Sequence, residues 1–105
     1  MVTHVTKENF AAEVRNAKGI VIADFWAEWC GPCKRYGPEF EAAAAAHSDK
    51  AKFVKVNVDQ AEDLAAEFGV MSIPTTIFFK NGQQVDEAVG ILSRDALLAK
   101  IRSHQ

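Results

Sequence analysis

The chain contains a nearly unbroken apolar run, Ile20-Val21-Ile22-Ala23-Asp24-Phe25-Trp26, and soon afterwards the segment Trp29-Cys30-Gly31-Pro32-Cys33-Lys34. An apolar run of this length is the pattern of a strand that is buried on both faces of a sheet. The residues that follow, as far as about residue 47, are rich in Ala, Glu and Arg and have a proline at the start, which predicts a long helix. The sequence therefore predicts a strand-to-helix junction that carries two cysteines.

Patterns on either side of this junction predict the other strands. Residues 53–58 alternate apolar positions with Lys55 and Asn57 and indicate a second buried strand. Residues 76–79 indicate a third strand, and the dipeptide Asn81-Gly82 predicts a hairpin that joins it to a strand near residues 85–89. Residues 2–5 are expected to form an edge strand.

Capping residues and helical spacing predict three more helices. Thr6 is placed to cap the first, Gly69 to end the third, and Ser93 to cap the last. The apolar positions that define these helices are Phe10 and Val14, Leu64 and Phe68, and Leu97, Leu98 and Ile101. Strands that alternate with helices and end in a hairpin predict a single α/β domain over residues 1–105. Its central mixed sheet, a parallel core with an antiparallel hairpin, is flanked by helices on both faces.

Composition and charge exclude several classes of protein. The 105 residues are 49% hydrophobic and 25% charged, which is typical of a globular domain and not of a disordered chain or a disulfide-stapled miniprotein. The 12 Lys and Arg against 14 Asp and Glu give a net charge of −2, so the basic surface of a nucleic-acid or membrane binder is missing.

The amino-terminal residues bear on where the protein acts. Residues 1–6 lack a basic region followed by an apolar stretch, and no uncharged apolar run approaches the ~18 residues of a spanning helix. We therefore expect a cytoplasmic monomer with no membrane and no nucleic-acid partner. In that compartment a cysteine pair is more often redox-catalytic or metal-binding than structural.

Cys30 and Cys33 are spaced for a disulfide that is made and broken in turnover. Residues three apart on a helical turn are neighbours, with Cβ atoms about 5–6 Å apart, so a small adjustment joins the sulfurs. The ring is too short to stabilise the fold much. Cys30 precedes the helix, where unpaired N–H groups favour a thiolate, so it is the expected nucleophile and the more exposed thiol. Cys33, one turn later, is the expected resolving thiol.

A metal site is the main alternative for a Cys-x-x-Cys pair. A structural zinc site needs four ligands, and the pair supplies half of them. The remaining candidates, His4, His47 and His104, are widely separated, and there is no second cysteine pair. We therefore expect no bound metal.

The segment from Asp24 to Lys34, with Ile73-Pro74-Thr75 and Lys80-Asn81-Gly82 further along, resembles the thioredoxin family over essentially the whole chain. The resemblance implies the thioredoxin fold and a protein-disulfide reductase that serves general cell redox homeostasis. It also implies a cis peptide bond before Pro74, which faces the cysteines, and a backbone at Ile73 that pairs with an extended client segment. Further residues of the implied client surface around Cys30 are Trp29, Gly31, Pro32 and Gly90.

Asp24 is the one charged residue of its apolar run. Burial raises the pKa of a carboxyl group unless the group is paired, and Lys55 matches the family's partner for this aspartate. We expect Asp24 to accept the proton of Cys33, directly or through water. The alternative is a buried aspartate that is kept for folding.

The resemblance also implies how the cysteine pair is recycled and used. No metal or organic cofactor is expected. An external NADPH-dependent flavoprotein, thioredoxin reductase, would reduce the pair, and clients would include peroxiredoxins and the sulfoxide and ribonucleotide reductases.

Two other functions remain open. An oxidase or isomerase of the same fold is disfavoured by Gly31-Pro32, since isomerases place a histidine before the second cysteine. A docking subunit without turnover would use the surface near Trp29 and Pro74.

Overall fold

A computed structural model describes residues 2–105 and shows a five-stranded sheet of order β1-β3-β2-β4-β5. The strands β1, β3 and β2 are parallel, and β4 and β5 add an antiparallel hairpin. The predicted mixed sheet is therefore confirmed. The strands are β1 (Val2–Val5), β2 (Ile20–Trp26), β3 (Lys52–Asn57), β4 (Thr75–Lys80) and β5 (Gln83–Val89).

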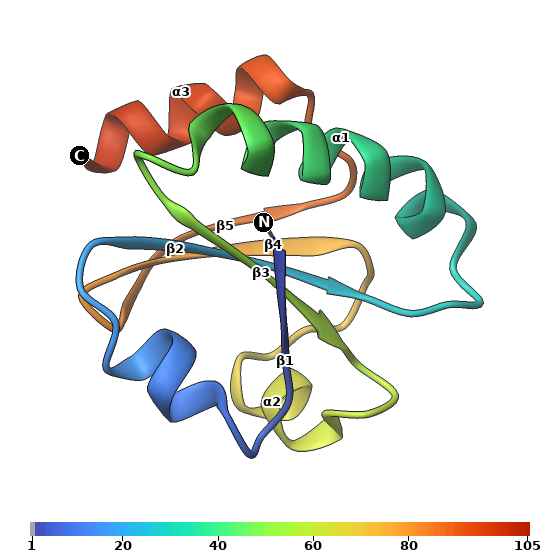
Figure 1. Ribbon diagram of the computed structural model, residues 1–105. Coiled ribbons are helices and arrows are strands. Elements are labelled where there is room, and N and C mark those ends of the chain that lie inside the picture. The colour runs from blue at the N-terminus through green and yellow to red at the C-terminus, as the bar shows by residue number, and fades with distance from the viewer. Residues whose placement is uncertain (1) are drawn as a thin grey trace.

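Helices cover both faces of the sheet (Figure 1). The long helix α1 (Gly31–His47) and the last helix α3 (Arg94–His104) lie on one face. The short π-helix η1 (Ala11–Arg15) and α2 (Glu62–Glu67) lie on the other. The predicted ends of the later helices are confirmed, since Gly69 follows α2 with a φ of +65° and the Ser93 hydroxyl accepts a hydrogen bond from the Ala96 N–H at 3.1 Å.

The first helix differs from its prediction. It is a single π-type turn, in which the Asn16 N–H bonds the Ala11 carbonyl at 2.8 Å, and its N-cap position is Phe10, which makes no side-chain cap. The Thr6 hydroxyl instead accepts the Glu8 N–H at 3.3 Å. A threonine hydroxyl can satisfy a nearby N–H in a turn as readily as at a helix end. Thr6 therefore opens the turn before the helix and does not cap the helix.

The alternation of side chains along β2 divides the core into two layers. Val21, Ala23 and Phe25 pack beneath η1 and α2. Ile20 and Ile22 pack beneath α1 and α3. Since successive strand residues point to opposite faces, Asp24 lies on the face that α1 covers. This is also the helix that begins at the cysteine pair.

The β4–β5 hairpin packs against the end of η1 at a glycine. Asn81 and Gly82 have φ values of +52° and +83°, as the predicted Asn-Gly turn requires. A Cβ atom added to Gly82 would collide with the carbonyl oxygen of Arg15. The turn therefore needs glycine for two reasons, the positive φ and the close approach of another backbone.

The substitution Gly82→Ala should destabilise the fold by more than positive φ alone explains. Gly69→Ala is the matched control, because Gly69 has a φ of +65° with nothing within 4 Å of an added Cβ. We expect a loss of about 1 kcal/mol for the control and about 2–4 kcal/mol for Gly82→Ala in urea unfolding. Equal losses in the two variants would show that the contact with Arg15 relaxes freely.

Candidate functional site

A disulfide between Cys30 and Cys33 lies where β2 passes into α1. Cys30 occupies the N-cap position, Cys33 lies in the first helical turn, and their Cα atoms are 5.2 Å apart. The Cys33 N–H donates to the Cys30 sulfur at 3.2 Å. Pro32 lies at the start of the helix and has no N–H of its own. In the reduced protein the same N–H, at the positive end of the helix dipole, favours a thiolate on Cys30.

The burial of the two cysteines differs from the prediction. We expected Cys30 to be the more exposed, but the exposed fractions are 4% for Cys30 and 3% for Cys33. Both pack with Ala27, and the half-buried side chains Trp26, Val58 and Ile73 cover them. Side chains from three separate segments of the chain pack on the cysteines. The two residues are therefore almost equally buried, although the local turn predicts a difference in their exposure. The chemical difference between the two thiols therefore rests on their positions in the helix.

The loop before β4 brings distant residues beside the cysteines. The Ile73–Pro74 peptide bond is cis, as the resemblance implies, and the Ile73 carbonyl oxygen lies 3.7 Å from the Cys30 sulfur. Pro74 is buried, and its carbonyl accepts the Gly90 N–H at 2.8 Å. Ile73, Pro74 and Gly90 thus form one wall, which reaches Cys30 at Ile73, although they come from two different loops.

Exposed side chains are next to the cysteines and this wall along the chain. Trp29 is 70% exposed, and its indole N–H donates to an Asp59 carboxylate oxygen at 2.9 Å. Met71 and Ile91 are exposed apolar residues on the two loops of the wall. Sequence reasoning missed Asp59, Met71 and Ile91. Asp59 could have been found, because it follows β3 and the carboxyl ends of parallel neighbours meet at one edge of the sheet.

Asp24 is fully buried beneath α1. Its register partners are Lys55 in β3 and Thr76 in β4. Within residues 2–105, neither of its carboxylate oxygens has a hydrogen-bond partner. Burial raises the pKa of Asp24 to about 7, and the nearby Lys55 charge opposes this rise. The predicted upward shift is therefore confirmed, and its cause is desolvation.

Lys55 lies beside Asp24 in register, but its ammonium group contacts other residues. Lys55 Nζ is 3.9 Å from the Glu41 carboxylate and 4.6 Å from the centre of the Trp26 ring. Among residues 2–105, Lys55 forms an ion pair with Glu41 and forms none with Asp24. Lys55 therefore lowers the pKa of Asp24 through its charge, without an ion pair between them. Glu41, which sequence reasoning missed, pairs with the Lys55 ammonium group.

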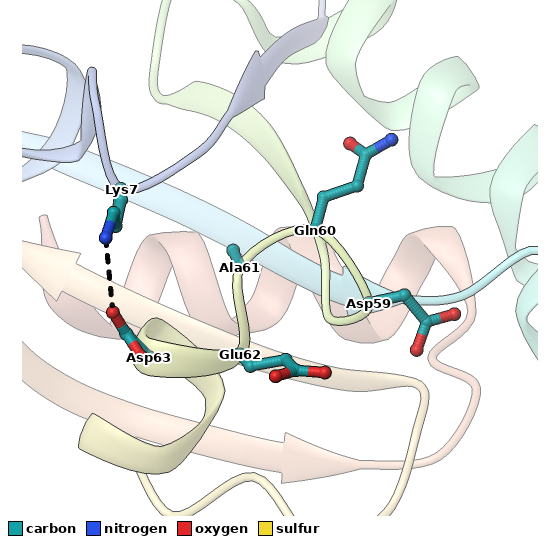
Figure 2. A pocket seen from close by; sticks show the side chains of 6 residues that line it. All are labelled: Lys7, Asp59, Gln60, Ala61, Glu62 and Asp63. Atoms are coloured by element: carbon teal, nitrogen blue, oxygen red, sulfur yellow. Dashed lines mark ion pairs between the residues drawn. The ribbon is translucent and has the colours of Figure 1, made fainter.

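A polar hollow of about 260 Å³ is lined in part by Asp59 (Figure 2), the residue that accepts the Trp29 indole N–H. Figure 2 shows Asp59 turned away from Lys7 and Asp63, which form an ion pair at 3.6 Å. The hollow lies at the start of α2, and we assign no ligand to it. Its lining residues are Lys7, Asp59, Gln60, Ala61, Glu62 and Asp63.

The histidines considered as metal ligands lie apart from the cysteines. His104 Nε2 is 2.9 Å from the Asp86 carboxylate, which also binds Lys100. In the described part of the chain, no three His, Cys, Asp or Glu residues are grouped so that they could hold a metal ion. None of the described helices is both long and apolar enough to cross a membrane.

Comparison with known proteins agrees with this geometry. A family model described as Thioredoxin matches residues 1–103. The chain is similar to a thioredoxin of Bacillus subtilis, with 41% identity covering 98% of this chain and 97% of the relative. A thioredoxin of Chlamydia muridarum is 44% identical over the full length of both chains. A thioredoxin of Mycoplasma genitalium is 45% identical over 93% of this chain and 95% of its own.

Alkylation of the reduced protein near neutral pH should modify Cys30 before Cys33. The two side chains are almost equally buried, so the order of labelling reports the thiolate fraction that the helix N-terminus sets. Brief treatment with iodoacetamide followed by peptide mass spectrometry measures this order. Faster labelling of Cys33 would reverse the assignment of the nucleophile, and labelling of the urea-unfolded protein provides the control without a helix.

Proposed function

Because the chain belongs to the thioredoxin family and is a thiol–disulfide oxidoreductase, we propose that it reduces client disulfides with Cys30 as nucleophile and Cys33 as resolving thiol. The observation that carries these roles is the position of Cys30 at the N-cap of α1, with the Cys33 N–H 3.2 Å from its sulfur. The cysteine pair is itself the redox group, so the exchange uses no organic cofactor.

The exchange proceeds in two displacement steps. The Cys30 thiolate attacks one sulfur of the client disulfide, and the other client sulfur leaves as a thiolate. Cys33 then loses its proton and attacks the Cys30 sulfur, which releases the second client sulfur. The client gains two electrons and becomes a dithiol, and Cys30 and Cys33 are left as a disulfide. The short spacing of the pair makes the second step intramolecular and therefore fast.

Asp24 is the proton acceptor for Cys33 in this proposal, either directly or through a water molecule. A general base works best when its pKa lies near the working pH, and burial places the pKa of Asp24 at about 7. Asp24 lies on the face of β2 beneath α1, and the first turn of α1 carries Cys33. Lys55 supports this role, because its positive charge limits how far burial raises that pKa.

The client would bind across the exposed surface beside Cys30. Trp29 supplies an exposed ring, and Gly31 and Pro32 are exposed at the start of α1. The loop of Ile73 and Pro74, with Gly90 behind it, would pair through its backbone with an extended client segment. Such pairing places a client sulfur in line with Cys30 without demanding one client sequence.

The partners follow from the family. We propose that a flavin-dependent reductase that draws on NADPH recycles the pair, and that the clients include peroxiredoxins and the sulfoxide and ribonucleotide reductases. The protein would act in the cytoplasm as a monomer. The Gly31-Pro32 dipeptide favours the reducing direction over oxidase or isomerase activity.

The substitution Cys33→Ser should trap clients as stable mixed disulfides on Cys30, because the thiol that releases them is gone. Purified complexes analysed by mass spectrometry under non-reducing conditions should show Cys30 joined to client cysteines. Cys30→Ser is the matched control and should trap none. If Cys33→Ser gives only non-covalent complexes, the docking subunit without turnover becomes the better explanation.

The substitution Asp24→Asn should separate a catalytic aspartate from a structural one. The unfolded aspartate ionises near pH 4 and the folded one near pH 7, so the parent loses stability as the pH rises from 4 to 7. The Asp24→Asn variant has no titrating group at this position, so it does not lose stability in this way as the pH rises. We expect similar unfolding free energies at pH 4 and a gain of a few kcal/mol for Asp24→Asn at pH 8.

The same variant should exchange disulfides more slowly near neutral pH, chiefly in the step in which Cys33 attacks. Stopped-flow measurement of mixed-disulfide resolution checks this rate. A less stable but fully active Asp24→Asn would show that Asp24 is structural and that water alone takes the proton.

A further inference from the structure

A row of three polar residues crosses the sheet beneath α1. Lys55, Asp24 and Thr76 are register partners on β3, β2 and β4, so their side chains lie on the same face. Directly opposite residues of an antiparallel pair have Cβ atoms about 4.5–5.5 Å apart. Thr76 is therefore an immediate neighbour of the Asp24 carboxylate. It is 0% exposed, as is Asp24.

Tyr36 of α1 completes this row from above. Its hydroxyl lies 2.8 Å from the Thr76 hydroxyl, and the tyrosine is fully buried. Burial raises the pKa of Tyr36, and although the Thr76 hydrogen bond opposes this rise, the Asp24 charge adds to it. Tyr36 therefore remains protonated near neutral pH. It acts as a hydroxyl dipole close to Asp24, and not as a base.

Apolar side chains surround this hydroxyl pair, and their packing does not depend on the two hydroxyl groups. Ile22, Phe40 and Phe78 belong to the same buried cluster. Replacing both partners of a buried hydrogen bond by apolar groups of the same shape is often neutral for stability. Two hydroxyls supply two protons, and the hydrogen bond between them uses one. The other hydroxyl proton is not used in this hydrogen bond and is free to point toward a third group.

Among the described residues, no charged side chain makes a hydrogen bond to Asp24, so the unused hydroxyl proton can point toward its carboxylate. On β3, Lys55 is held toward Glu41 and Trp26, and Glu41 itself is on α1. On β4 the neighbour is the uncharged Thr76, and the buried titratable residues of α1 are Tyr36, which bonds Thr76, and Cys33, which does not titrate while it forms a disulfide. The hydroxyl pair is thus an uncharged polar group that can respond when Asp24 gains or loses its charge.

We propose that Tyr36 and Thr76 form a positioning pair for Asp24, whose hydroxyl dipoles turn toward the carboxylate when it ionises and set the pH at which it accepts the Cys33 proton. This inference rests on the proposed role of Asp24. When Asp24 is ionised, Tyr36 donates to Thr76 and the Thr76 proton points toward the carboxylate. When Asp24 is protonated, the hydrogen bond reverses and Thr76 donates to Tyr36. No proton leaves either hydroxyl.

The direction of the effect follows from the strength of the two arrangements. A hydroxyl whose proton points toward a carboxylate stabilises the ionised form more than the protonated form, because the attraction is then between a dipole and a full charge. The pair therefore favours the ionised form of Asp24 and lowers its pKa relative to an apolar pair. Removing the Thr76 hydroxyl, alone or together with that of Tyr36, should leave Asp24 protonated up to a higher pH.

The test measures the titration of Asp24 by carbon NMR of its carboxyl group in the oxidised protein, where the cysteines do not titrate. The variants are Tyr36→Phe, Thr76→Val and the double variant, which leaves no orphaned hydroxyl. In Thr76→Val and the double variant we expect the midpoint to rise by about half a unit or more, roughly a threefold change in the dissociation constant. In Tyr36→Phe we expect a smaller rise, because Thr76 still points its proton toward the carboxylate but is no longer polarised by a donor. Thr76→Ser keeps the hydroxyl and should titrate like the parent.

Thr75→Val is the matched control. It removes a neighbouring buried hydroxyl whose register partner is Phe25, on the opposite face of β2, and should leave the Asp24 midpoint unchanged. An unchanged midpoint in Tyr36→Phe, Thr76→Val and the double variant overturns the proposal, whatever the activity.

The rate of mixed-disulfide resolution, measured against pH, separates this inference from the proposed function. We expect the profile of Thr76→Val to shift to higher pH by the same amount as the Asp24 midpoint. If the midpoint shifts and the rate profile does not, Asp24 is not the proton acceptor, while the effect of the hydroxyl pair on Asp24 stands.

Discussion

The pairing of β2 with β3 on one side and with β4 on the other is the constraint on which the rest of the structure depends. It buries β2 on both faces, which requires helices above and below the sheet. It also fixes where β2 ends, and the chain must turn there into α1. The cysteine pair lies at the positive end of a long helix because β2 ends just before it and the chain continues there as α1.

The same pairing creates a costly feature of the core. Asp24 could be replaced by an apolar residue with a gain in stability, since burial raises its pKa to about 7 and leaves its oxygens without partners among residues 2–105. Its neighbours in register, Lys55 and Thr76, supply a charge and a dipole but no direct hydrogen bond. A carboxyl group held in this way is poorly suited to stabilising a fold. It is well suited to exchanging a proton near neutral pH.

Two unlike surroundings meet at the cysteines. Toward the core, Ala27 and the half-buried Trp26, Val58 and Ile73 exclude water from the sulfurs. Toward solvent, exposed apolar side chains such as Trp29 form the surface on which we propose that a client binds. Water exclusion strengthens the electrostatic effect of the helix N-terminus on a thiolate. In the proposed reaction, a client bound on the apolar surface would keep water away from the sulfurs during exchange.

The sequence by itself determined the order of the elements, the Asn81-Gly82 hairpin and the identity of the cysteine pair, because these depend on local periodicity, turn chemistry and a spacing of three residues. It also singled out Asp24, since a charge within an apolar run stands out without a structure. Thr6 misled because a threonine can serve a turn or a helix end with the same local sequence. Only the tertiary structure decided the equal burial of Cys30 and Cys33, the turn of Lys55 toward Glu41, and the meeting of Tyr36 with Thr76. Each of these depends on contacts between segments that strand register and helix packing bring together, and no local pattern encodes them.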